Sequence, residues 1–472
     1  MIRLTSGAAL AIALLAQPAA ADTLAAAIAS AYETNPDLAV ERARVRQVDE
    51  QVPQALSFGR PTVDATVAQQ QSGLDFADNG RTMAVGLNIN QSLYRGGRTR
   101  SATNAADNRI FAARARLRAA ENNVILNTVT AYADVIRYAG LVDLNANQVK
   151  VLERELQASR DRFEVGDLTR TDVAQSDARL ANARSNYISA QGQLSNAREF
   201  YRRVVGRPPE DLAPLPPLPV LPGTQGQATD LANANNPSLV AARFDEAAAR
   251  YDVSTIERER LPSVGVGVGA DYQKFNGGGG GGNFVQQGAF FTQNAGVQLS
   301  VPLYQAGAVA SRVREAQARR SQLLEQIGST GRQVVEQATN AFVQVGIARA
   351  IIQSSQVAVD ANALALEGVT QENQVGTRTV IEVLNAQQEL LITRTNLVVA
   401  RRDEYVAGYT LLAAVGAAEA AALEVPVTQY DATLNAREIR HKWNDFDLPK
   451  NPPALPLPDK AVASRSMTVA PR

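Results

Sequence analysis

The 472-residue sequence contains no cysteine, which excludes disulfide bonds, thiolate metal sites and a lipid anchor on an N-terminal cysteine. It has a single histidine, His441, and a single tryptophan, Trp443. A solitary histidine without ligand-type spacing around it does not indicate a metal or catalytic site. The 47 acidic residues balance the 47 basic ones, so no net field draws the chain to nucleic acid. Scarce aromatics favour long helices with narrow apolar seams over one thick globular core.

Long hydrophobic runs are also lacking, because no segment offers the ~20 uninterrupted apolar residues of a membrane helix. The N-terminus has Arg3, a short apolar run at 8–16, and three alanines before Asp22. This is the pattern of a secretory signal peptide. We therefore expect residues 1–21 to be removed after Ala21, giving a secreted protein without a transmembrane helix.

An internal repeat organises the rest of the chain. Asn35-Pro36 recurs as Asn236-Pro237, about 201 positions later, and Val165-Gly166 recurs as Val375-Gly376, about 210 positions later. The extra residues of the second copy fall around the glycine run 277–282, which suits an exposed loop. We predict repeat 1 at 22–207, a proline-rich linker at 208–228, repeat 2 at 229–416 and an irregular tail at 417–472.

Both repeats predict the same order of elements. A helical segment comes first, followed by two runs in which apolar and polar residues alternate, at about 62–67 and 83–90, then 264–268 and 295–301. Alternation with a period of two is typical of membrane β-barrel strands. Proline-free helical stretches follow at about 95–163 and 307–374, each spanning roughly 100 Å at 1.5 Å per residue. Turns at Gly166 and Gly376 then lead into a second helix.

Four strands cannot close a barrel, and lipid tolerates no open sheet edge, so the chain must assemble. Two chains would give eight strands with a filled interior, whereas three give twelve and leave a water-filled lumen. The predicted fold class is an α+β membrane protein. Its trimeric twelve-stranded β-barrel, with four strands per chain, continues into a long α-helical barrel, and the chain carries an internal two-fold sequence repeat.

Several motifs together resemble the TolC family of outer-membrane efflux and secretion channels. They are the duplicated Asn-Pro, the strand endings at 91–97 and 301–307, and the block Val-Gly-Thr-Arg-Thr-Val-Ile-Glu-Val-Leu at 375–384. The resemblance covers the chain to about Gly416. It implies a homotrimer in outer-membrane lipid with a large periplasmic part, which docks an inner-membrane transporter through a periplasmic adaptor protein. Whether the cargo is small toxic compounds, secreted proteins or both stays open.

Carboxylates lie at equivalent places just after the two turns, Asp172 in repeat 1 and Glu382 in repeat 2. One interpretation is that these charges only stabilise the N-termini of the returning helices. The other is that three copies of Glu382 converge into an acidic ring that favours cations. Members of the family often have a second aspartate where Asn385 stands, and Glu389, two turns further, is a candidate replacement.

The resemblance also implies a clamp that holds the periplasmic mouth shut. Arg378 matches the family's arginine in the second turn, and Thr171-Asp172 matches its partner in the first. Tyr94 and Tyr304, at the strand ends, are expected at the membrane interface.

Other functions fit the sequence less well. Residues 265–270 superficially match a dinucleotide fingerprint, but the helix and the acidic residue that should follow are missing. Residues 277–282 lack the Lys-Ser/Thr of a phosphate loop. No convergent nucleophile, base or metal cluster indicates an enzyme, and no cofactor is expected. The alternative is a structural coiled-coil stalk or adhesin, which has no need for four alternating strands.

Overall fold

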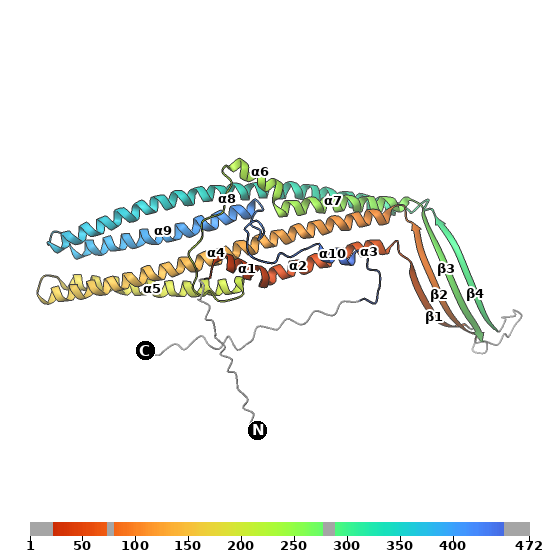
Figure 1. The fold of residues 1–472 in the computed structure, drawn as a ribbon, viewed down its shortest axis with the longest axis horizontal. Helices are drawn as coiled ribbons and strands as arrows, with labels where there is room; N and C mark the ends of the chain where they lie inside the picture. Colours follow the sequence, from red (N-terminus) through yellow and green to blue (C-terminus); the bar gives the residue numbers. More distant parts are fainter. Residues whose placement is uncertain (1–21, 73–79, 277–287, 448–472) are drawn as a thin grey trace, which may run out of the picture.

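The computed structural model describes residues 22–72, 80–276 and 288–447 of the chain. The predicted signal peptide, the glycine run 277–282 and the end of the predicted tail lie outside these ranges. The molecule is a long helical body with a sheet at one end (Figure 1). Among the described residues, no helix has an apolar stretch long enough to cross a membrane.

The two repeats have the same element order (Figure 1). Repeat 1 contains α1 Leu24–Thr34, α2 Pro36–Asp49, α3 Gln51–Ser57, β1 Thr62–Ser72, β2 Gly80–Tyr94, α4 Arg98–Glu164 and α5 Arg170–Val205. Repeat 2 contains α6 Gln225–Asn235, α7 Pro237–Glu257, the 3-10 turn η1 Arg258–Arg260, β3 Ser263–Asn276, β4 Gly288–Ser300, α8 Ala308–Gln374 and α9 Val380–Ala414. A last helix, α10 Leu434–Ile439, lies in the C-terminal segment.

The four strands form one antiparallel sheet in the order β1-β2-β3-β4, so β1 and β4 are its edges within the chain. Its two faces differ in chemistry. One row across the sheet brings together Thr66, Gly86, Asp271 and Thr292. The adjacent row brings together Val67, Val85, Tyr272 and Phe291. Val67 and Phe291 are 74% and 64% exposed, so the apolar face is uncovered in the single chain.

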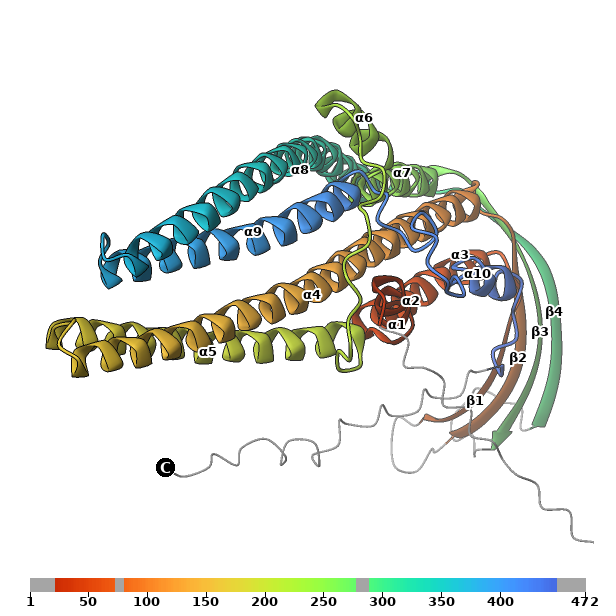
Figure 2. The same ribbon diagram turned by 60° about the vertical axis from the view of Figure 1, so that its left-hand side comes forward.

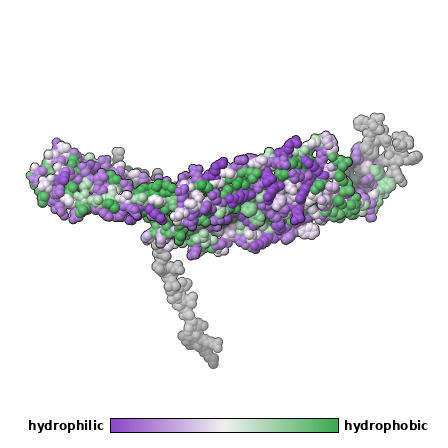
Figure 3. Space-filling view, turned by 90° about the horizontal axis from the view of Figure 1, so that it is seen from above, coloured by the Kyte–Doolittle hydropathy of each residue, from purple (hydrophilic) through white to green (hydrophobic). Residues whose placement is uncertain are grey.

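Hydropathy follows this division along the molecule. A hydrophobic band lies at the end that carries the strands, whereas the surface of the helical body mixes hydrophilic and hydrophobic residues (Figure 3). The strands are longer than the alternating runs predicted, because polar residues such as Gln70 and Arg81 continue the β1–β2 pairing. Apolar and polar residues alternate only in the part of a strand whose two faces lie in different environments, one apolar and one polar.

The helical body is built from two long hairpins, α4 with α5 and α8 with α9 (Figures 1 and 2). Helices α4 and α8 are each 67 residues long. The hairpins turn at Gly166 and Gly376, whose φ angles of 86° and 81° are left-handed. Only glycine adopts such angles without strain, which explains why both turns carry one.

The Asn-Pro motifs join helices end to end. Asn35 caps α2 and donates from Nδ2 to the carbonyl oxygen of Val204, at the end of α5, over 3.0 Å. Asn236 caps α7 and donates to the carbonyl oxygen of Ala414, the last residue of α9, over 2.9 Å. In each repeat, two helices thus meet end to end, α5 with α2 and α9 with α7, and form an interrupted rod beside the uninterrupted helix α4 or α8. The helical segment predicted at the start of repeat 1 consists of three helices, because the Asn35 cap separates α1 from α2 and a second break at Glu50 separates α2 from α3.

We call residues 22–34, 206–235 and 417–439 the belt, because they cross the middle of the helical body. Figure 2 shows the linker between α5 and α6 running across α4 and α9. The carboxylate of Asp22 accepts hydrogen bonds from Tyr201 Oη at 2.9 Å and from Arg207 Nη2 at 2.6 Å. Residues 417–447 of the predicted tail are irregular except for α10, and they lie against the body, where α10 packs on α2 and Asn435 donates to buried Asp49.

Candidate functional site

The tip of the first hairpin is closed by a capping box at the start of α5. The amide of Asp172 donates to Thr169 Oγ1, and the Asp172 carboxylate accepts from the amide and the hydroxyl of Thr169, at 2.9 and 2.7 Å. These two hydrogen bonds, that of the hydroxyl first, lower the pKa of Asp172. The carboxylate thus fixes the first turn of its own helix.

The tip of the second hairpin repeats this arrangement at the start of α9. The carboxylate of Glu382 accepts from the amide of Thr379 at 2.9 Å and from its hydroxyl at 3.0 Å. Arg378 adds a third donor, with Nη1 lying 2.6 Å from Glu382 Oε1. The amide of Thr379, then Arg378 and the Thr379 hydroxyl, lower the pKa of Glu382 to about 2. The carboxylate therefore stays charged at every physiological pH.

Arg378 is held within its own hairpin. Its Nε donates to Glu372 Oε2 over 2.7 Å while Nη1 contacts Glu382. The predicted pair with Asp172 is not formed within the chain, because both groups have local partners. Residues 378 and 382 are four positions apart, about one helical turn, so an ion pair between them costs little conformational entropy. Thr171 is exposed beside Asp172.

Different residues join the two hairpins. Arg179 Nη2 on α5 donates to Asn385 Oδ1 on α9 over 2.8 Å. Above it lies an apolar cluster in which Leu384 of α9 packs among residues of α4 and α5, namely Leu152, Leu156, Leu180 and Ala183. Sequence reasoning missed Arg179, since 206 positions separate it from Asn385 and no local pattern connects them. These contacts hold the tips of hairpin 1 and hairpin 2 side by side.

The three residues predicted for the selectivity site share one stripe of α9. Glu382, Asn385 and Glu389 are spaced three and four residues apart, which places them above one another on a helix. Asn385 and Glu389 are exposed and Glu382 is partly so. The aromatics predicted for the membrane interface are both exposed, Tyr94 at the end of β2 and Tyr304 four residues after the end of β4.

A sheet with one polar and one uncovered apolar face, continued by two long hairpins, defines the class of outer-membrane channel subunits. The chain belongs to the outer membrane efflux protein family, whose model matches residues 27–207 and 228–417. It is located in the outer membrane and is a subunit of an efflux or secretion channel. The alternative of a coiled-coil stalk or adhesin is not supported.

Individual relatives agree with this assignment. The chain is 32% identical over 430 residues to the outer membrane efflux protein BepC of Brucella suis, covering 91% of this chain and 93% of the relative. It is 26% identical over 408 residues to the outer membrane protein TolC of Vibrio cholerae, covering 84% and 91%. Its fold is similar to that of the Campylobacter jejuni CmeC outer membrane channel, with a TM-score of 0.73, 16% identity and 89% of each chain covered.

Proposed function

We propose that three copies of the chain form a continuous duct, with a twelve-stranded barrel in the outer membrane and a helical tube in the periplasm. The observation that carries this proposal is the four-stranded sheet with open edges at β1 and β4 and an uncovered apolar face. Lipid tolerates neither open edges nor unpaired backbone groups. Pairing of β1 in one chain with β4 in the next satisfies both edges, and three chains leave a lumen.

The absence of cysteine makes a direct test of this assembly possible. Each variant carries two cysteines in the same chain. One lies along β1, for example at Val63, and the other lies along β4, for example at Leu299. Oxidation of the membrane-extracted protein should give covalent dimers and trimers for the β1/β4 combinations that lie opposite one another, and none for β1 paired with a second site on β1. A conducting monomer, or cross-linked species that stop at two chains, would overturn the trimer.

We further propose that the duct receives its cargo from an inner-membrane transporter through a periplasmic adaptor protein, and that the chain itself catalyses no reaction. Relatives are named both for efflux, as BepC is, and for protease secretion, as AprF of Pseudomonas aeruginosa is, so the proposed cargo comprises small compounds, secreted proteins or both. The 375–379 turn and the 166–169 turn are the parts farthest from the sheet (Figure 1), and they are where an adaptor would bind. In-cell photo-crosslinking from Thr377, followed by identification of the linked protein, tests this. A turn that captures only copies of the same chain contradicts it.

At the tip, we propose that Glu382 forms the acidic ring of a periplasmic constriction, with Glu389 as a second ring and Asn385 as a neutral position between them. The proposal is supported by their common stripe on α9 and by the depressed pKa of Glu382. A ring of carboxylates favours cations. Arg378 and the pair Thr171-Asp172 remain the proposed gate clamp, which must act between neighbouring chains because the pair is not formed within one.

Planar-bilayer recordings separate the gate from the filter. Arg378→Ser should raise the open probability, because it frees the turn and any clamp between chains. Glu382→Gln should lower cation preference and weaken block by multivalent cations. Since Arg378 donates to Glu382, the two effects are coupled, and the double variant isolates the coupling. Unchanged open probability in Arg378→Ser, together with unchanged selectivity in Glu382→Gln, would leave both groups as helix caps only.

A further inference from the structure

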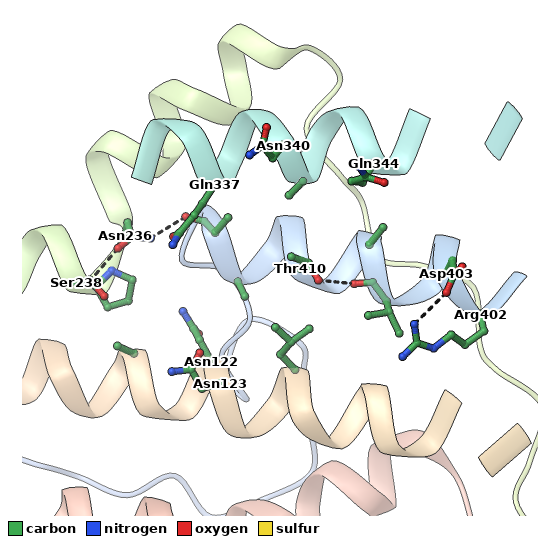
Figure 4. Close-up of a pocket in the computed structure, with 18 residues that line it drawn as sticks. Asn122, Asn123, Asn236, Ser238, Gln337, Asn340, Gln344, Arg402, Asp403 and Thr410 are labelled. Atoms are coloured by element: carbon green, nitrogen blue, oxygen red, sulfur yellow. Dashed lines mark hydrogen bonds and ion pairs between the residues drawn. The ribbon is translucent and has the colours of Figure 1, made fainter. Parts of the chain in front are cut away.

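A recess of about 600 Å³ lies in the middle of the helical body, where α9 ends and α7 begins (Figure 4). Helices α4, α8 and α9 form its walls. Carboxamide side chains gather around it, two from α4 and three from α8, namely Asn122, Asn123, Gln337, Asn340 and Gln344. We call this the amide recess. Its size is in the range of pockets that hold small molecules.

The recess combines amides with a small apolar surface and little free charge. Alanines such as Ala341 and Ala407 line it between the polar groups. Its charged lining residues, Arg402 and Asp403, form an ion pair of 2.9 Å, and Arg402 also contacts Asp134 outside the recess at 2.9 and 3.3 Å. The site therefore offers many neutral donors and acceptors and no unpaired ion to select a charged ligand.

Asn122 gives an independent indication of a missing contact. Its side chain is 3% exposed, and none of the described residues donates to its Oδ1. Most buried carboxamide oxygens accept a hydrogen bond, because leaving one unpaired costs free energy. The adjacent Asn123 and the facing Gln337 point their amides into the same space in Figure 4. A ligand with donor groups would supply what this wall lacks.

The recess opens away from the belt. On α4, Leu117, Val124 and Ala131 pack into the core beneath the belt, whereas Asn122 and Asn123 line the recess. At 100° per residue, these two sets lie about 150° apart around the helix, on opposite sides of it. Three belts would fill the passage if they lay inside a ring of three chains, so the belt is outside. The amide recess then faces the lumen, inside each chain's own wall.

We propose that the amide recess binds an uncharged amphiphilic molecule, which carries several hydroxyl or amide groups beside a compact apolar part. This inference rests on the trimeric duct proposed above and adds to it a cargo site half-way along the lumen. Neutral donors and acceptors match hydroxyl and amide groups, and the alanines accept the apolar part. Each trimer has three such sites.

Protection of a single cysteine tests binding, because the chain has no cysteine of its own. Asn340→Cys places a thiol at the recess, and Gln326→Cys places one on the same face of α8, about four turns away. Both positions are exposed. The probe is chloramphenicol, which is neutral and carries an amide, two hydroxyls and an aromatic ring. At about nine times its dissociation constant, it should slow labelling of Asn340→Cys by N-ethylmaleimide about tenfold. Labelling of Gln326→Cys should not change.

A recess variant and a trimer assay complete the test. Gln337→Ala in the Asn340→Cys background should abolish protection. Equal protection at both cysteines would mean that the probe only obstructs the lumen. No protection at either cysteine would mean that the recess does not bind the probe. Either result overturns the inference. Native mass spectrometry of the same samples shows whether the protein is trimeric. A trimer without protection defeats the recess alone, whereas a chain that is not trimeric defeats the proposed duct.

A second measurement tests the direction of the recess. A maleimide attached to a large polyethylene glycol should label Gln225→Cys on the belt of the closed trimer. It should fail to label Asn340→Cys, which N-ethylmaleimide still reaches. Equal reaction of the large reagent at both positions would place the recess on the outside and overturn the luminal site.

Discussion

Replacement of Asn236 by alanine should loosen the middle of the helical body. Asn236 Oδ1 accepts from the amides of Ser238 and Leu239, at 3.0 and 3.4 Å, and Nδ2 donates to Ala414 over 2.9 Å. Loss of an N-cap costs ~1 kcal/mol. The buried carbonyl of Ala414 loses its partner as well, which adds ~1–3 kcal/mol. The expected total is about 2–4 kcal/mol per chain.

Hydrogen exchange at the start of α7 measures this loss locally. About 2 kcal/mol corresponds to roughly 30-fold faster exchange of the amides of Ser238 and Leu239, if they exchange by local opening. Asn236→Ser retains an N-cap oxygen but is too short to reach Ala414, so it should show an intermediate effect. Asn235→Ala is the matched control, because Asn235 is the exposed residue just before the motif.

The reasoning fails if Asn236→Ala and Asn235→Ala exchange at the same rate. It also fails if exchange increases uniformly through α4 and α8, since the contact belongs to the junction between α9 and α7. The same substitution in repeat 1, at Asn35, provides an internal replicate, because its amide bridges α2 to α5 over 3.0 Å.

Three further outcomes follow from the tip and the belt. Leu384→Ala removes a buried side chain, 3% exposed, from the cluster between the hairpins and should destabilise their contact by ~2–5 kcal/mol. It should therefore raise the open probability in bilayers. Val375→Ala, at an exposed turn position, should leave the open probability unchanged. The pKa of Glu382 is depressed from 4.5 to about 2, so its stabilisation of the tip is complete above pH 4.5 and lost as the pH falls towards 2; hydrogen exchange of peptide 372–384, corrected for intrinsic rates, should show this, and Glu382→Gln should abolish it. Tyr132→Phe removes a buried hydroxyl that lies 2.8 Å from the carbonyl oxygen of Asp22 and 2.7 Å from that of Ala213; it should cost ~0.5–1.5 kcal/mol in denaturant unfolding, while Tyr187→Phe changes nothing.

Periodic features could be predicted from the sequence, because each reports a repeated environment. Alternation along β2 and β3 reflects a sheet with two unlike faces, and seams such as Val334, Ala338 and Ala341 on α8 reflect one continuous packing partner. At Glu382 the sequence analysis predicted only a charge that stabilises the helix N-terminus, although Thr-x-x-Glu at 379–382 is also the local signature of the capping box that the structure contains.

Contacts between distant segments could not be predicted in the same way. The Asn-Pro motif was visible, but its role depends on a carbonyl 169 positions away in the first repeat. The position of Arg378 suggested a clamp, yet its side chain pairs with Glu372 and Glu382, whose competition a family pattern does not reveal. The order in the C-terminal segment arises from single contacts, such as that of Asn435 with Asp49, and not from any periodicity.

The paired rods differ in how they carry mechanical load. Helices α4 and α8 connect the membrane end to the tip by covalent backbone, whereas their neighbours are interrupted at Asn35 and Asn236 and transmit tension only through non-covalent contacts. If the proposed periplasmic gate opens by a swing of a tip hairpin, the interrupted rod can pivot at its junction while the continuous helix bends. The tip could then widen without pulling the strands apart, and the barrel in the membrane would stay closed to lipid during the motion.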